Sequence, residues 1–411
     1  MAGVLTADRT RALAAAALIP AVAARRALLA TFLGFGGFIG LFAGAVPTVT
    51  RLGGIDNQTL GWCFTIFTLA GITTQALGSR LGRWFSPKSI LLTLFPVGVF
   101  AIALLMAARS GAAFAAALVG FGIVTALIDL YMNSEATILE ETSGRPLMTV
   151  FHGCVSLNIA LFAVISSVLA AEFGPLSTMP VAIAIGLITS FVISRLLRDG
   201  PADAASQRSA SHVPIARSQL IRLAGHGLSL GLVTAAETSA IFWAAKLFAD
   251  HSSALSMIAG AATAFFAGFQ AAARFAGDSL RKYFGDLSLL IGSIFVATAG
   301  CLSIGVFDNA IVRAFALAIF GVGVGAIVPI ILAAIGREMG DARVRGIGIS
   351  AAVSGVPRTV LPWIFGLIAA GSSIAQGFLA ASVCLVLALV IVLVLNAQSS
   401  RNAQPPLRNP F

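Results

Sequence analysis

Charged residues are scarce in this chain: only 10% of its 411 residues are Asp, Glu, Lys or Arg, whereas 58% are hydrophobic. A soluble domain needs roughly a quarter of its residues charged to stay dissolved. The composition therefore excludes a soluble globular protein. The apolar residues also form long runs and not the short alternating segments of a β-barrel. We expect an all-α integral membrane protein, in which each helix satisfies its own backbone.

Residues that carry catalytic or metal chemistry are also rare. The four cysteines are scattered inside apolar runs, which excludes a disulfide framework or a metal-ligand spacing. No P-loop motif is present, so the chain supplies no ATPase of its own, and the glycine run 321–325 lies in an apolar segment without the strand that a dinucleotide fingerprint needs. No nucleophile, base and oxyanion donors cluster together. We expect no enzyme activity, no cofactor and no metal.

What the chain has in excess is positive charge, with 26 basic against 16 acidic residues. In a membrane protein such a balance indicates basic loops on the cytoplasmic side, and we do not expect nucleic-acid binding. The apolar runs supply about twelve spans of about 20 residues each. They lie near residues 27–47, 58–79, 88–108, 111–136, 148–171, 177–197, 219–247, 253–276, 287–306, 310–335, 346–370 and 372–397.

The longest polar stretch, residues 198–217, divides the spans into two sets of six. We therefore expect an N-terminal six-helix bundle over 27–197, a linker over 198–217 and a C-terminal six-helix bundle over 218–397. Residues 1–26 are expected to be an uncleaved N-terminal segment with room for an interfacial helix, and 398–411 a tail.

Basic residues predict the orientation. With the N-terminus in the cytoplasm, only Arg51, Arg109, Lys246 and Arg313 fall on the opposite side and Arg358 falls inside a span, which leaves 21 of the 26 on the cytoplasmic side. Because basic loops stay in the cytoplasm, both termini and the linker are expected there, with the protein in a bacterial-type inner membrane.

The two halves of the sequence also resemble each other. The loop at 78–85, after the second span, is similar to that at 277–285, after the eighth, and 140–145 is placed like 338–345. Equivalent loops on one side of the membrane indicate a parallel repeat, with a pseudo-two-fold axis along the membrane normal.

With these features the chain resembles the major facilitator superfamily. That family has a loop of the form Gly-x-x-x-Asp-Arg-x-Gly-Arg-Arg between its second and third helices. Arg80, Gly82 and Arg83 match its basic and glycine positions, but Ser79 stands where the family has Asp. The second copy keeps Asp278, whereas a cation replaces its glycine at Arg281. The resemblance covers nearly the whole chain and implies a transporter.

A narrower similarity involves the stretch from Asp129 and Asn133 through Arg145 to His152, which resembles a bacterial branch near the fucose-permease-like carriers. It implies a permease and a sugar-like solute.

The loop motif has a physical interpretation of its own. Glycine turns let two helix ends approach, and arginines reach carboxylates and helix C-termini. We therefore expect a cytoplasmic gate at Arg80, Gly82, Arg83, Asp278 and Arg281. The alternative is that these cations only fix the topology.

Two charges are predicted near the middle of the membrane. Glu237 lies in the seventh span and Arg358 in the eleventh, beside Gly355 and Pro357. Ionisable groups at that depth need a partner or water, so each is a candidate for function. The pair could bind a solute, and Glu237 is the candidate proton carrier. The alternative is a static ion pair, and Pro357 suggests a helix irregularity beside a cavity.

Further polar residues are candidates for the solute site or the gate. Asp129 and Asn133 share a helix face, because they are four residues apart. Two interpretations remain for these residues. Asp129, Glu135, Arg145 and His152 could form a cytoplasmic gate, or they could contact the solute directly. The other candidates for solute or proton contact are Asn158, Gln270, Gln75 and Arg274.

The sequence thus favours a monomeric secondary transporter that moves a small polar solute by alternating access, with the lipid bilayer as its surroundings and protons as the candidate coupling ion. A drug-efflux carrier of the same fold and a non-transporting membrane sensor are the alternatives. Charges at the midplane favour a polar solute over lipophilic drugs.

Overall fold

The computed structural model describes residues 2–198 and 215–402. It is an all-helical bundle, and no strand occurs in these two stretches. The first six helices are α1 (Ala2–Leu52), α2 (Asn57–Gly78), α3 (Pro87–Ala107), α4 (Gly111–Ser143), α5 (Met148–Phe173) and α6 (Met179–Leu196). They are followed by α7 (Arg217–His251), α8 (Gly260–Phe284), α9 (Asp286–Val306), α10 (Ala310–Gly325), α11 (Ile327–Met339), α12 (Arg343–Gly371) and α13 (Ile374–Asn402).

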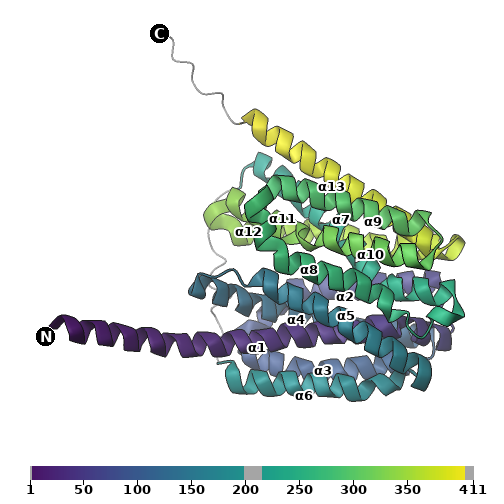
Figure 1. The fold of residues 1–411 in the computed structure, drawn as a ribbon, viewed down its shortest axis with the longest axis horizontal. Coiled ribbons are helices and arrows are strands. Elements are labelled where there is room, and N and C mark those ends of the chain that lie inside the picture. The colour runs from purple at the N-terminus through teal and green to yellow at the C-terminus, as the bar shows by residue number, and fades with distance from the viewer. Residues whose placement is uncertain (1, 199–214, 403–411) are drawn as a thin grey trace, which may run out of the picture.

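Local signals fix the helix ends. The Asp56 side chain accepts a hydrogen bond of 2.7 Å from the backbone N–H of Thr59 and thereby caps α2. Gly144 ends α4 in a left-handed conformation (φ 63°) that few other residues adopt without strain. These stops keep the connections short, so that successive helices run antiparallel through the bundle (Figure 1).

Eleven of the described helical segments are long and apolar enough to cross a membrane, with α10 and α11 counted together. The twelfth, α8, falls short because one of its faces carries Gln270, Arg274, Asp278, Arg281 and Lys282. A helix with one polar face belongs in a membrane bundle only where that face meets protein or water. The prediction of about twelve spanning helices is confirmed, and α8 is the polar one.

The tenth span is broken between α10 and α11 at Ala326. Pro329 explains the break, because it has no N–H to donate to the carbonyl of Gly325 four residues earlier. The expected irregularity near Arg358 takes a milder form: α12 stays helical through Pro357 and Pro362. The Pro362 ring nonetheless leaves the Arg358 carbonyl without its helical donor.

The contacts between helices repeat across the two halves, α1–α6 and α7–α13. In the first half α1 packs on α5 and α6, α3 on α4 and α6, and α2 on α4; in the second half α7 packs on α12 and α13, α9 on α10 and α13, and α8 on α10. Between the halves, α5 packs on α8 and α2 on α12. This is the parallel pseudo-two-fold arrangement that the sequence predicts (Figure 1).

Glycines allow the closest of these helix pairs. A Cβ added at Gly40 of α1 would lie 2.7 Å from the carbonyl oxygen of Ile159 in α5. In the second half, a Cβ at Gly231 of α7 would lie 2.5 Å from the carbonyl oxygen of Ser354 in α12. Small residues at equivalent places therefore let the backbones of both repeats touch, as in other membrane bundles.

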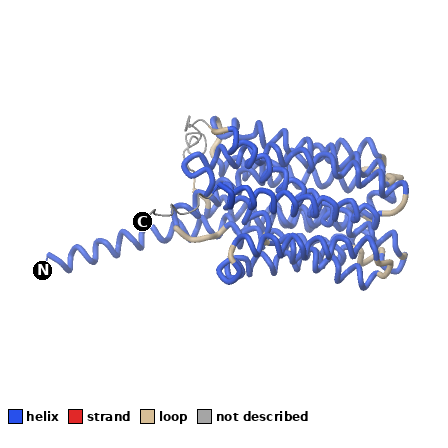
Figure 2. The backbone as a smooth tube through the Cα atoms, turned by 90° about the horizontal axis from the view of Figure 1, so that it is seen from above, coloured by secondary structure: helices blue, strands red, loops and turns tan. Residues whose placement is uncertain are grey.

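The two ends of the bundle differ. α1 enters and α13 leaves at the same end, which we call the basic end because it also holds Arg80, Arg83 and Arg281 (Figures 1 and 2). At the opposite end α2 and α12 touch: a Cβ at Gly61 would lie 2.6 Å from the Cα atom of Gly366. The Asn57 amide also donates 3.2 Å to the carbonyl of Ala369.

Aromatic rings close the centre of this opposite end. Phe242 of α7 stacks on Phe64 of α2 at 5.2 Å and packs against Phe42 of α1 at 5.3 Å between ring centroids. Phe67 and Phe121 complete this aromatic cluster. It joins the two halves and closes the bundle between its centre and the end opposite the basic end.

The N-terminal segment, in which the sequence left room for an interfacial helix, is helical and continuous with the first span (Figure 2). Most of the 198–217 linker and the end of the 398–411 tail lie outside the described residues. The predicted domain boundaries therefore stay a prediction.

Candidate functional site

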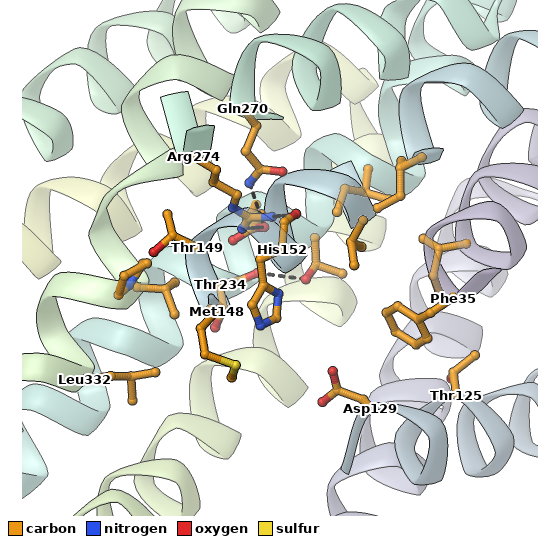
Figure 3. A pocket seen from close by; sticks show the side chains of 18 of the residues that line it. Phe35, Thr125, Asp129, Met148, Thr149, His152, Thr234, Gln270, Arg274 and Leu332 are labelled. Carbon is orange, nitrogen blue, oxygen red and sulfur yellow. Dashed lines mark hydrogen bonds and ion pairs between the residues drawn. The ribbon is translucent and has the colours of Figure 1, made fainter. Parts of the chain in front are cut away.

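A cavity of about 640 Å³ lies between the two halves. It begins below the aromatic cluster at Ile39 and Ile241, and it extends along α4 and α8 to Glu140 and Asp278 at the basic end. Helices α1, α2, α4 and α5 of the first half and α7, α8, α11 and α12 of the second half line it. Figure 3 shows Asp129 on one wall, with Gln270 and Arg274 across the open space.

Glu237 forms an ion pair on the cavity wall. Its Oε1 lies 3.0 Å from the Nη2 of Arg274 and accepts a hydrogen bond of 2.7 Å from the Gln270 amide. Ser156 of α5 closes the ring, because its hydroxyl accepts from Arg274 Nη1 at 2.6 Å and donates to Gln270 Oε1 at 2.9 Å. This polar ring of Ser156, Glu237, Gln270 and Arg274 joins the first half to the second.

The ring is almost completely removed from solvent. Gln270 is 0% exposed and Arg274 8% exposed, and Arg274 also donates to the His152 carbonyl at 3.3 Å. A carboxylate that accepts from an amide and a guanidinium at once is held in one position. Glu237 is thus fixed against α8 by two donors.

A second polar chain crosses the first half. The Gln75 amide of α2 donates 2.9 Å to Asp129 Oδ2, and Asn133 Nδ2 donates 2.9 Å to Asp129 Oδ1. Asn133 Oδ1 in turn lies 3.1 Å from His152 Nε2 of α5. Asp129 therefore contacts neutral amides, and both its carboxylate oxygens accept a hydrogen bond.

Arg358 lies on the same cavity wall but differs from the other arginines there. It interacts electrostatically with Asp129 and Glu237 without touching either. In the described part of the chain no hydrogen bond or ion pair reaches its guanidinium, although Arg274 and Arg281 each bind a carboxylate. The direct pairing of Glu237 with Arg358 that the sequence allowed is replaced by the pair with Arg274.

Three other candidates lie away from the cavity wall. Asn158 donates 2.8 Å to the Leu33 carbonyl and holds α5 against α1. Asn133 donates a hydrogen bond to Asp129 from outside the cavity wall, and Glu135 is half-buried on α4. Direct solute contact by Asn133 and Asn158 is therefore not what the geometry favours, because neither side chain lines the cavity.

The expected gate residues form two unlike sets. Arg80 and Arg83 are exposed at the basic end, as is Arg145, and none of these three has an ion pair in the described residues. In the second half Arg281 binds Asp286 at 2.9 Å, and Arg337 of α11 binds the same carboxylate at 2.7 Å.

Two of the gate candidates reach the cavity. Asp278 and Arg281 line it near the basic end. Gly82 lies beside Arg83 in the short 3₁₀ turn Ser79–Arg83 that follows α2. A gating role for any of these residues stays a prediction.

Sequence reasoning missed Ser156, which no charge or motif marks. A serine in an apolar span is common, because its hydroxyl can donate to its own helix. The one available signal is its spacing from His152: a four-residue separation places both on one face of α5.

A family model described as Major Facilitator Superfamily matches residues 27–344. The chain belongs to this superfamily. It is 23% identical over 344 residues to an uncharacterised MFS-type transporter of Yersinia pestis, covering 82% of this chain and 86% of that protein. It is also 23% identical over 301 residues to the membrane protein MosC of Rhizobium meliloti, covering 71% and 70% of the two chains.

Solved structures of the superfamily share the fold. A D-xylose-proton symporter superposes with a TM-score of 0.73 at 14% identity, covering 91% of this chain and 97% of that one. The nucleoside transporter NupG superposes with a TM-score of 0.66 at 11% identity, covering 92% and 99%. At such identities the likeness shows the fold alone. The resemblance to a fucose-permease-like branch stays a prediction.

Proposed function

We propose that this protein is a secondary transporter that moves a small polar solute by alternating access, coupled to protons. The cavity carries this proposal: it lies between two pseudo-symmetric halves, is sealed at one end by the aromatic cluster, and extends to the other end. A transporter with such a repeat exposes one central site first to one side and then to the other. The structure then corresponds to the state that faces the basic end.

The helix contacts suit such a movement. The halves meet along α5 with α8 and α2 with α12, and small residues lie where these backbones come closest. Gly61 against Gly366 is a contact without side chains to interdigitate, so the two helices can separate without repacking a core. Opening that seam while the basic end closes completes the exchange of access.

Protons are best carried by Asp129. The sequence pointed to Glu237, but protonation of Glu237 would break its ion pair with Arg274. Asp129 instead accepts from two neutral amides. An amide offers both a donor and an acceptor, so a rotation of Gln75 would let its oxygen accept the proton of a neutral Asp129. The charged and the neutral form of the Asp129 side chain can therefore both make hydrogen bonds to the neighbouring amides.

The rival functions fit the cavity less well. A carrier of lipophilic drugs needs a large apolar pocket, whereas this one presents Asp129, Glu237, Arg274 and Arg358 at its centre. A membrane sensor would bind its ligand without moving it. The D-xylose and nucleoside carriers of the same fold make sugars, sugar acids and nucleosides a suitable panel of compounds for the test.

The test has two steps. Purified protein is screened for compounds that raise its melting temperature, because a ligand stabilises the state that binds it. Each such compound is then offered to proteoliposomes with and without an inward proton gradient. We expect accumulation that depends on the gradient. A compound that binds but is never taken up would favour the sensor.

The orientation is part of the proposal. We infer that the basic end faces the cytoplasm of a bacterial inner membrane, because most basic residues lie on that side. We also infer that the protein acts as a monomer, because the cavity lies within one chain. A reporter fused to the C-terminus tests the orientation, since a periplasmic signal would contradict it.

A further inference from the structure

Among the residues that the structure describes, the cavity contains one cation whose donors are unused. Of the three arginines that line it, Arg274 binds Glu237 and Arg281 binds Asp286. Arg358 lines the same cavity, and within residues 2–198 and 215–402 no acceptor lies within hydrogen-bonding distance of its guanidinium. A guanidinium offers five donors in a planar fork that matches a carboxylate.

Such a cation at membrane depth requires an explanation. Arg358 lies near the middle of α12, in a span where an ionised group is costly unless water or a partner compensates it. The two nearby carboxylates do not provide contact, because Glu237 is bound to Arg274 and Asp129 accepts from Gln75 and Asn133. The partner that completes Arg358 therefore has to enter the cavity.

Threonines indicate the rest of the ligand. Five of them line the cavity, and four of these donate to a carbonyl of their own helix, at distances of 2.9, 2.7, 2.8 and 2.7 Å for Thr68, Thr125, Thr234 and Thr238; the fifth is Thr149. With its proton committed to the helix, a threonine hydroxyl offers only acceptor lone pairs to the cavity. Acceptors along the wall suit a ligand that is rich in hydroxyl donors.

We propose that the solute is a hydroxylated monocarboxylate of the sugar-acid type, whose carboxylate binds the guanidinium of Arg358 while its hydroxyl groups donate to the threonines of the cavity wall. This inference rests on the proposed transport function and names its substrate class. With Asp129 protonated, as the proposed proton coupling requires, the single unpaired cation matches one negative charge. A dianion such as a phosphate monoester would leave a charge uncompensated, because Arg274 is already neutralised by Glu237.

The test compares sugars that differ in charge at one position. Purified protein is titrated with D-glucose, D-glucuronate, D-gluconate and D-glucosamine, and with D-galactose and D-galacturonate, while the melting temperature is followed. At least one acid is expected to stabilise the protein, and its neutral and amino counterparts are not. The Arg358→Gln variant should bind that acid at least tenfold more weakly, because it loses a charge-assisted bidentate contact.

Two further variants make the result specific. Arg358→Lys keeps the charge without the planar fork, and it should recover part of the affinity that Arg358→Gln loses. Arg51→Gln removes an exposed arginine at the end of α1, away from the cavity, and should bind the acid as the wild type does. Retained size-exclusion profiles for all three variants would show that each one folds.

The contrary outcomes are equally defined. The inference is overturned if none of the acids stabilises the protein, if a neutral or amino sugar binds as tightly as the acid, or if Arg358→Gln binds the acid unchanged. A neutral sugar that binds and is taken up by proteoliposomes would overturn the substrate class and leave the transport function standing. If compounds bind but none of them is taken up, the transport function itself is overturned.

Discussion

The ion pair between Glu237 and Arg274 provides a quantitative test of the polar ring. We consider Arg274→Met, Glu237→Gln and the double variant. Arg274→Met removes the contacts to Glu237, Ser156 and the His152 carbonyl, and leaves Glu237 with the Gln270 amide as its remaining donor. Breaking a buried pair in this way typically costs about 3–5 kcal/mol, because it strands the other charge.

The cost should lie near the lower limit of that range. The side chains of Arg274 and Glu237 keep 10% and 13% of their exposure, and the adjoining cavity can supply water to a stranded charge. We therefore expect a loss of about 3 kcal/mol for Arg274→Met and about 2 kcal/mol for Glu237→Gln, which keeps an acceptor for Gln270. The double variant strands no charge, so its loss should be about 3 kcal/mol and not the sum.

Thermal unfolding in detergent measures these losses. For a chain of this size about 1 kcal/mol corresponds to a shift of about 1–2 °C. The matched control is Lys246→Met, which removes an ion pair with the half-exposed Asp250 one helical turn away and should cost about 0.3–0.5 kcal/mol. Additive losses in the double variant, or a loss for Arg274→Met no larger than for Lys246→Met, would refute the coupling.

Three other predictions concern the carrier cycle. Asp129→Asn should abolish accumulation of the solute driven by a proton gradient, while solute exchange persists. Accumulation at the wild-type level would show that another residue carries the proton. Gly61→Leu should lower stability by about 1–3 kcal/mol through overpacking, whereas Gly120→Leu on the open face of α4 should not, and equal melting temperatures would contradict the close seam. Arg83→Ala should speed thiol labelling at Leu332→Cys in the cavity, and an unchanged rate would leave Arg83 with a topological role.

Much of the fold follows from composition. Long apolar runs fix the number of spans, and basic loops fix how they alternate, because both depend on one-dimensional patterns. The eighth span was expected at 253–276 and lies at Gly260–Phe284. The difference arises because its C-terminal part carries the charges that face the cavity, and hydropathy alone disfavours including them.

The sequence predicted how deep in the membrane the site residues lie, but not which neighbours their side chains contact. Glu237 and Arg358 were expected at one height, and both line the cavity. Their partners depend on how each helix is rotated and tilted, which is set by packing against neighbours and not by spacing along the chain. That is why Arg274 of α8 reaches Glu237 first, and why Asn158 faces the Leu33 carbonyl in place of the cavity.

Alternating access is tested most directly by labelling one cavity position from each side of the membrane. Ile241→Cys lies on the cavity wall below the aromatic cluster, in a background where Cys63, Cys154, Cys301 and Cys384 are replaced. A membrane-impermeant thiol reagent is applied either to right-side-out or to inside-out vesicles. An alternating carrier should be labelled from both sides, with a saturating solute changing the two rates in opposite directions. Labelling from the basic end alone, at a rate that no solute alters, would contradict transport through this cavity.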